Sequence, residues 1–67
     1  MKYLVRYMPP YSNARNLYYG GFINDNPTWY ASPKYAIGFD TYSDSRHVLE
    51  LLSGFMRMPT KFFDICT

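Results

Sequence analysis

The chain has 67 residues, a formal net charge of +2 and 21% aromatic residues, including eight tyrosines. A chain of this length forms one small domain, residues 1–67, with a marginal core. The aromatic content excludes a disordered chain. The seven lysines and arginines are too scattered for the basic surface that duplex nucleic acid requires.

The cysteine and histidine content limits what can stabilise so small a core. Cys66 is the only cysteine and His47 the only histidine. An internal disulfide is therefore excluded, and these two ligands are too few for a tetrahedral zinc site. We expect neither a metal nor a cofactor. Self-association or a bound partner is the expected supplement to the core.

The N-terminal sequence lacks the continuous apolar segment of a secretory signal, because Pro9-Pro10 interrupts it. No apolar run is long enough to span a bilayer. A lone cysteine also fits a reducing compartment. The sequence therefore predicts a cytoplasmic protein without a membrane segment.

Three strands rich in tyrosine and aliphatic residues are predicted in the first half of the chain. They comprise residues 2–8, 17–23 and 28–31. A loop over residues 9–16 joins the first two strands. Gly20-Gly21 marks a bulge or a close backbone approach. The turn formers from Asn24 to Pro27 join the second strand to the third, which completes an antiparallel meander.

One helix is predicted over Tyr42–Ser53. Ser32-Pro33 starts only a single turn, to about Ala36. Thr41 and Asp44 have the spacing of a capping box, with Asp in place of the usual Glu, and Gly54 is the expected left-handed C-cap. The apolar face of the helix is expected to comprise Ser45, Val48, Leu52 and Phe55, with Leu51 beside them.

Residues 61–66 form the last predicted strand, after a connector that ends at Pro59. The fold class is therefore α+β, with the order β-β-β-α-β and the helix packed on one face of the sheet. A right-handed crossover would place the last strand beside the first and parallel to it, in the sheet order 4-1-2-3.

A single helix covers only one face of such a sheet, so aromatic side chains are expected on the other. This face is predicted to carry Leu4, Met8, Tyr18, Phe22, one of Trp29 or Tyr30, and Phe62. A cluster of this size exceeds the apolar patch usual on a monomer. Three interpretations remain open. The 9–16 and 32–40 segments cover the face, a homodimer buries it, or a protein partner binds it.

Two further sets of residues extend the predicted partner-binding surface. Arg6 lies on the first strand, and Tyr11 and Arg15 project from the first loop, which is either a contact region or a plain solvated connection. The alternative function is single-stranded nucleic-acid binding, in which bases stack on exposed aromatics and scattered cations follow the backbone. Its candidate residues are Tyr18, Phe22 and Trp29, with Arg6, Arg15 and Lys61 nearby.

The candidates for catalysis are better explained by structure. His47 has Glu50 one turn away, which is an ordinary helix-surface pair, and it lacks the partner groups that a general base needs. Asp40 and Asp44 flank the helix start, where capping and the helix dipole account for them. No phosphate-binding glycine loop or Ser-His-Asp arrangement is present. We do not expect an enzyme.

The segment from Trp29 to Thr41 (WYASPKYAIGFDT), after a tyrosine-rich meander and before one helix and a closing strand, resembles small bacteriophage-encoded accessory proteins. The resemblance covers most of the chain and carries no catalytic residues across. It implies a non-enzymatic protein that binds a host protein and inhibits or redirects it.

Overall fold

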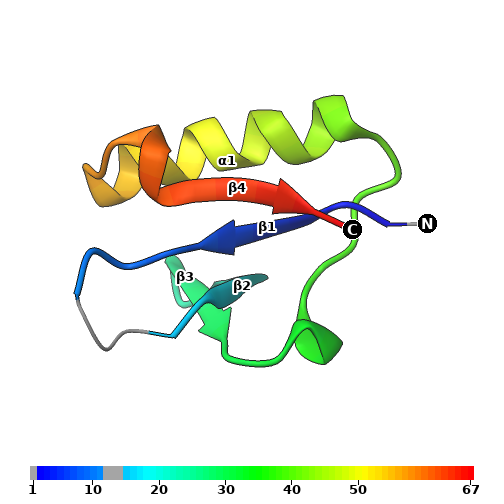
Figure 1. The fold of residues 1–67 in the computed structure, drawn as a ribbon, viewed down its shortest axis with the longest axis horizontal. Coiled ribbons are helices and arrows are strands. Elements are labelled where there is room, and N and C mark those ends of the chain that lie inside the picture. The colour runs from blue at the N-terminus through cyan, green and yellow to red at the C-terminus, as the bar shows by residue number, and fades with distance from the viewer. Residues whose placement is uncertain (1, 12–14) are drawn as a thin grey trace.

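The computed structural model of the protein describes residues 2–11 and 15–67, so the middle of the predicted first loop lies outside the described residues. The described chain forms a four-stranded sheet with one α-helix, which confirms the α+β class (Figure 1). In chain order the elements are β1 (Leu4–Tyr7), β2 (Leu17–Ile23), β3 (Asn26–Tyr30), the 3-10 turn η1 (Pro33–Tyr35), α1 (Tyr42–Met56), the 3-10 turn η2 (Thr60–Phe62) and β4 (Phe63–Cys66).

The strand order β3-β2-β1-β4 is the predicted one, but the predicted parallel pairing of the last strand with the first is wrong. β4 pairs antiparallel with β1, and Leu4 lies opposite Cys66. The pairing is antiparallel because the chain runs the length of the sheet once more, after β3 and before the helix begins. Residues 36–39 already return the chain to the start of β1, where Phe39 and Tyr3 exchange backbone hydrogen bonds of 2.8 and 2.9 Å. The helix then runs in the direction of β1, and β4 returns against it (Figure 1).

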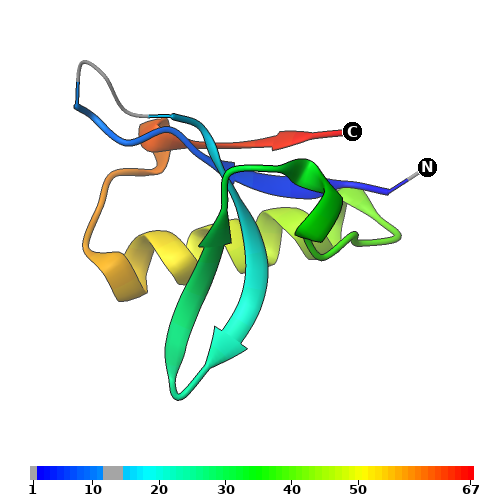
Figure 2. The same cartoon turned by 90° about the horizontal axis from the view of Figure 1, so that it is seen from below.

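The β2–β3 hairpin turns away from the rest of the sheet. β2 pairs with β1 only at Leu17 and Tyr18, and Figure 2 shows the hairpin extending across the helix direction. The gap that opens is filled by the extended segment 36–39, in which the Ile37 amide donates to the Tyr19 carbonyl at 2.9 Å. The turn uses only Asn24 and Asp25, both at positive φ, so β3 begins earlier than predicted.

The helix begins at the predicted cap, where Oγ1 of Thr41 accepts a hydrogen bond from the Asp44 amide at 3.1 Å. It ends three residues later than predicted, at Met56 instead of Ser53. Gly54 remains helical, and Arg57 adopts the left-handed conformation instead, with φ 55° and ψ 40°. The Arg57 and Met58 amides donate to the Gly54 and Ser53 carbonyls of the last turn. The Ser53 hydroxyl donates to the carbonyl of Met58, beyond the helix end.

The core lies between α1 and the β1–β4 half of the sheet. It comprises Val5, Tyr7, Tyr19, Leu49, Leu52 and Phe63. The buried side of α1 is centred on Ser45, Leu49 and Leu52, so the predicted apolar face is partly wrong. Leu51 and Phe55 are 60% and 55% exposed, because they project from the flank of the helix.

The buried tyrosines give the fold an alkaline limit that can be measured. Burial raises the pKa of Tyr7 and of Tyr19 above the ordinary value of 10.0. In the unfolded chain both phenols ionise at the ordinary pKa. The contribution of the two neutral phenols to the free energy of unfolding is therefore complete below about pH 10 and is lost as the pH rises through the higher pKa values of the folded state. We expect the thermal midpoint to fall steeply above about pH 10 and to fall less in Tyr7→Phe/Tyr19→Phe.

The side chain of Tyr42, which is 54% exposed, provides the matched control. Tyr42→Phe should keep the alkaline decline of the unmodified protein, because it leaves both buried phenols in place. An equally steep decline in Tyr7→Phe/Tyr19→Phe would show that other groups set the limit.

Candidate interaction surfaces

One residue from each strand contributes to a row across the sheet face that α1 leaves uncovered. The register pairs Asp64 with Arg6, Arg6 with Tyr18, and Tyr18 with Tyr30. We call these four residues the cross-strand row. Val5, next to Arg6 in β1, is buried in the core beneath α1. Alternation along the strand therefore places the row on the opposite face.

An ion pair forms one half of the cross-strand row. Nε of Arg6 donates to Oδ1 of Asp64 at 2.8 Å, and Nη2 donates to Oδ2. These hydrogen bonds to Asp64 raise the pKa of the Arg6 guanidinium, and a hydrogen bond involving Tyr18 contributes in the same direction. Because the pair is neutral, this half of the row presents little net charge.

Tyrosine rings form the other half of the cross-strand row. A Cβ atom on Gly20 would lie well inside 3.0 Å of the Tyr30 ring, so the absence of a side chain at Gly20 lets this ring lie against the backbone of β2. The Tyr35 ring follows, with its centroid 5.6 Å from that of Tyr30 and the planes at 46°. Tyr30 is half-buried, and Tyr35 is 60% exposed.

A second surface lies on the helix side, between the hairpin and the flank of α1. The Phe22 and Phe55 rings meet edge to face, with centroids 5.7 Å apart. Leu51 lies one turn before Phe55 on the same flank, and Pro27 lies opposite Phe22 in the sheet. We call Phe22, Pro27, Leu51 and Phe55 the hairpin–helix patch. Its three larger side chains are each at least 51% exposed.

Two of the predicted partner-binding residues are not on the uncovered face. Trp29 packs on the helix side among Tyr7, Tyr19 and Phe63, so Tyr30 is the residue of this pair that reaches the uncovered face. Phe22 also lies on the helix side. The register between β2 and β3 shifts between Tyr19 and Phe22, and this bulge reverses the alternation of side chains.

The other predicted residues are distributed around the sheet. Leu4 shares the face of the cross-strand row and is half-buried, as are Met8 and Phe62. The Met8 amide donates to the Phe62 carbonyl at 2.7 Å, and Phe62 packs partly against the core. Tyr11 and Arg15 are both exposed. Their role in binding stays a prediction.

The described segments do not bury the uncovered face completely. Residues 36–39 lie in the gap between β1 and β2, where their backbone completes the sheet. Of the described segments, η1 packs beside the face through Tyr35. Tyr18 and Tyr30 are half-buried and keep part of their surface open to solvent.

The outer side of α1 has a shallow depression of about 400 Å³. It is lined by Tyr42, Ser43, Arg46, His47 and Glu50. Nε of Arg46 lies 3.9 Å from Oε1 of Glu50, which is the spacing of a helix-surface ion pair. Among the described residues, no three His, Cys, Asp or Glu side chains gather as metal ligands would.

Comparison of the chain with protein-family models, with curated proteins and with solved structures finds no match. In the part of the chain that the structure describes, no helix has the length and apolar character needed to cross a bilayer.

Proposed function

We propose that this chain is a non-enzymatic protein-binding module whose partner docks on the hairpin–helix patch. Through the resemblance to phage accessory proteins, the partner is a host protein that binding inhibits or redirects. One observation carries the proposal. Phe22, Leu51 and Phe55, from two separate elements, come together and stay at least half-exposed.

The composition of the patch supports a protein as the partner. Large aromatic and aliphatic side chains at the centre of a surface supply most of the binding energy in protein complexes. Phe22 is also held in place, because its ring contacts the buried Tyr19 ring at 6.1 Å between centroids. A ring fixed before binding loses less entropy when the partner arrives.

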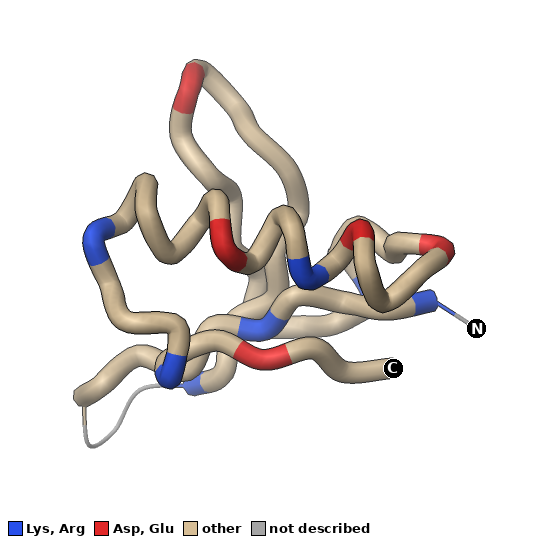
Figure 3. Tube along the Cα trace, turned by 90° about the horizontal axis from the view of Figure 1, so that it is seen from above, with Lys and Arg blue, Asp and Glu red and all other residues tan. Residues whose placement is uncertain are grey.

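Acidic residues near the hairpin–helix patch indicate which charge the partner carries at the border of its binding surface. Figure 3 shows acidic positions at the hairpin tip and along α1. Asp25 lies in the turn just after Phe22 and Ile23, and Asp44 precedes Leu51 by seven residues, on the same flank of α1. We therefore expect an apolar partner surface bordered by lysine or arginine, since complementary rim charges favour encounter.

The test is capture of the partner from bacterial lysate by the tagged chain, followed by affinity measurement with the purified partner. Leu51→Ser/Phe55→Ser should weaken binding at least about 10-fold, the loss expected when central contacts of more than about 1.4 kcal/mol are removed. Both side chains are more than half-exposed, so the fold should persist, as circular dichroism would verify.

Tyr42→Ser is the matched control, because it removes an aromatic side chain that is 54% exposed from the start of the same helix, on the side of α1 opposite Leu51. Equal affinity of the double variant and the unmodified chain would overturn the proposal. Sedimentation velocity tests the competing occupant. A dimer that Leu51→Ser/Phe55→Ser dissociates would identify a second copy of the chain, instead of a host protein, as the partner of the patch.

A further inference from the structure

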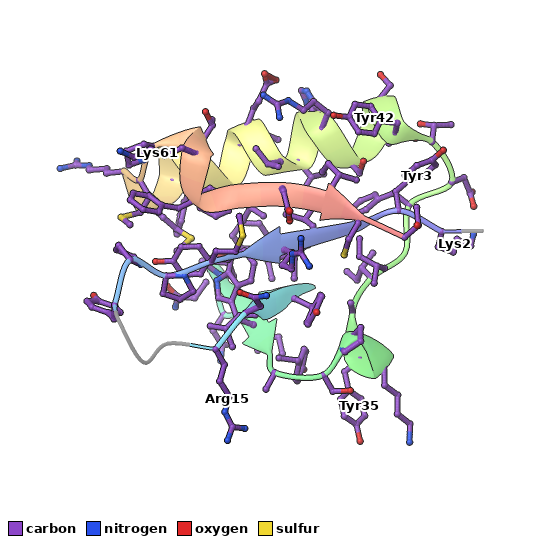
Figure 4. All side chains as sticks on the ribbon, in the orientation of Figure 1. Lys2, Tyr3, Arg15, Tyr35, Tyr42 and Lys61 are labelled. Carbon is purple, nitrogen blue, oxygen red and sulfur yellow. The ribbon has the colours of Figure 1, made fainter. Side chains whose placement is uncertain are left out.

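One cation without a carboxylate partner among the described residues lies over a tyrosine ring beside the uncovered face, and a second points to the same side of the molecule. Three of the basic residues form ion pairs, Lys2 with Asp40, Arg6 with Asp64 and Arg46 with Glu50. Lys34 and Arg15 have no carboxylate partner among the described residues. Nζ of Lys34 lies 5.8 Å from the centroid of the Tyr35 ring. Figure 4 shows Arg15 and Tyr35 pointing to the same side, away from α1.

The rings beside these cations are arranged as a platform. Tyr30 lies against the backbone at Gly20, and Tyr35 extends the aromatic surface beyond the sheet. Tyr18 lies on the next strand, directly opposite Tyr30. Rings lying on a sheet and bordered by cations are the combination by which proteins bind single strands, since every base has a face that stacks.

We propose that the uncovered face of the β2–β3 half binds single-stranded nucleic acid, with bases stacked on Tyr30 and Tyr35 and phosphates contacted by Arg15 and Lys34. The site is separate from the hairpin–helix patch, which lies on the other face of the same hairpin. Single strands are favoured over a duplex because stacking on such rings requires unpaired bases. The neutral pair of Arg6 and Asp64 limits the charged part of the site to the hairpin half.

The experiment measures binding of fluorescein-labelled oligothymidine and oligouridine to the full chain by fluorescence anisotropy at several salt concentrations. Tyr35→Ala should weaken binding about 5- to 150-fold, the loss of about 1–3 kcal/mol usual for one base–aromatic stack. Because Tyr35 is 60% exposed, the fold should survive this change. Arg15→Gln/Lys34→Gln should reduce the magnitude of the salt slope by about 1.4, or about 0.7 for each lost phosphate contact.

Two controls make the test specific. Lys61, a candidate cation in the sequence, lies over the Phe62 ring and on the opposite side of the view from Arg15 and Tyr35 in Figure 4. Lys61→Gln should therefore leave the affinity nearly unchanged. Leu51→Ser/Phe55→Ser should also leave it unchanged, so failure of one proposal does not affect the other. No binding by the unmodified chain at low salt would overturn the inference. Equal losses in Lys61→Gln and Arg15→Gln/Lys34→Gln, with none in Tyr35→Ala, would overturn it as well.

Discussion

Truncation of Leu49 to alanine is expected to lower the free energy of unfolding by about 2–5 kcal/mol. Leu49 is 0% exposed and lies at the centre of the buried side of α1, which packs on β1 and β4. Its removal loses apolar burial and leaves a cavity, because side chains on a sheet can relax only partly towards the helix. For a domain of this size such a loss is a large share of the total stability.

The control is Leu51→Ala, which removes the same atoms from the same helix two residues away. Leu51 is 60% exposed, so we expect a change of less than about 1 kcal/mol. Chemical denaturation followed by circular dichroism measures both variants, and the change in midpoint at constant slope reports the loss. Similar losses in the two variants would show that α1 does not pack on the sheet through Leu49.

The contrast between these two leucines also shows what the sequence could predict about α1. Its existence and its start followed from local signals, since Thr41 and Asp44 form the predicted cap. Its buried side did not follow, because apolar residues occupy too wide an arc of the helix for one sheet-facing stripe. The apolar arc is wider than the sheet can cover, and it places Leu51 and Phe55 on the flank of α1. This width was the feature of the sequence from which the hairpin–helix patch could have been predicted.

The direction of β4 depended on a segment with no regular structure. Sequence patterns predicted four strands and their order correctly, because each strand has local signals and neighbouring strands tend to pair. They did not reveal that residues 36–39 form backbone hydrogen bonds with Tyr3 and Tyr19. These bonds exist only when distant parts of the chain meet, so no local pattern predicts them.

The uncovered face was predictable where strand alternation is regular. On β1 the assignment of Leu4 to this face is correct, because the adjacent Val5 is buried on the other face beneath α1. On β2 the assignment of Tyr18 is correct, whereas that of Phe22 is wrong, because the bulge at Gly20-Gly21 lies between them. The sequence located the bulge but not its effect on the alternation, since the inserted residue can belong to either side of the pairing.

Gly20 supports the proposed nucleic-acid site, because the Tyr30 ring lies against its backbone. Gly20→Ala is expected to lower the free energy of unfolding by about 1–3 kcal/mol. The new methyl group would overlap the Tyr30 ring. The backbone itself is not the obstacle, because the left-handed glycine of this pair is Gly21, with φ 107°. The displaced ring would also leave the platform, so oligonucleotide affinity should fall together with stability.

A double-mutant cycle identifies the cause. In a Tyr30→Ala background the overlap is absent, so Gly20→Ala should cost much less than it does in the presence of the ring, and the difference measures their coupling. Gly54→Ala is the matched control, because a Cβ there meets no atom within 4 Å and alanine favours a helix by about 0.5–1 kcal/mol over glycine. An undiminished loss in the Tyr30→Ala background would place the obstacle in the backbone of β2 and remove Gly20 as the support of the Tyr30 ring.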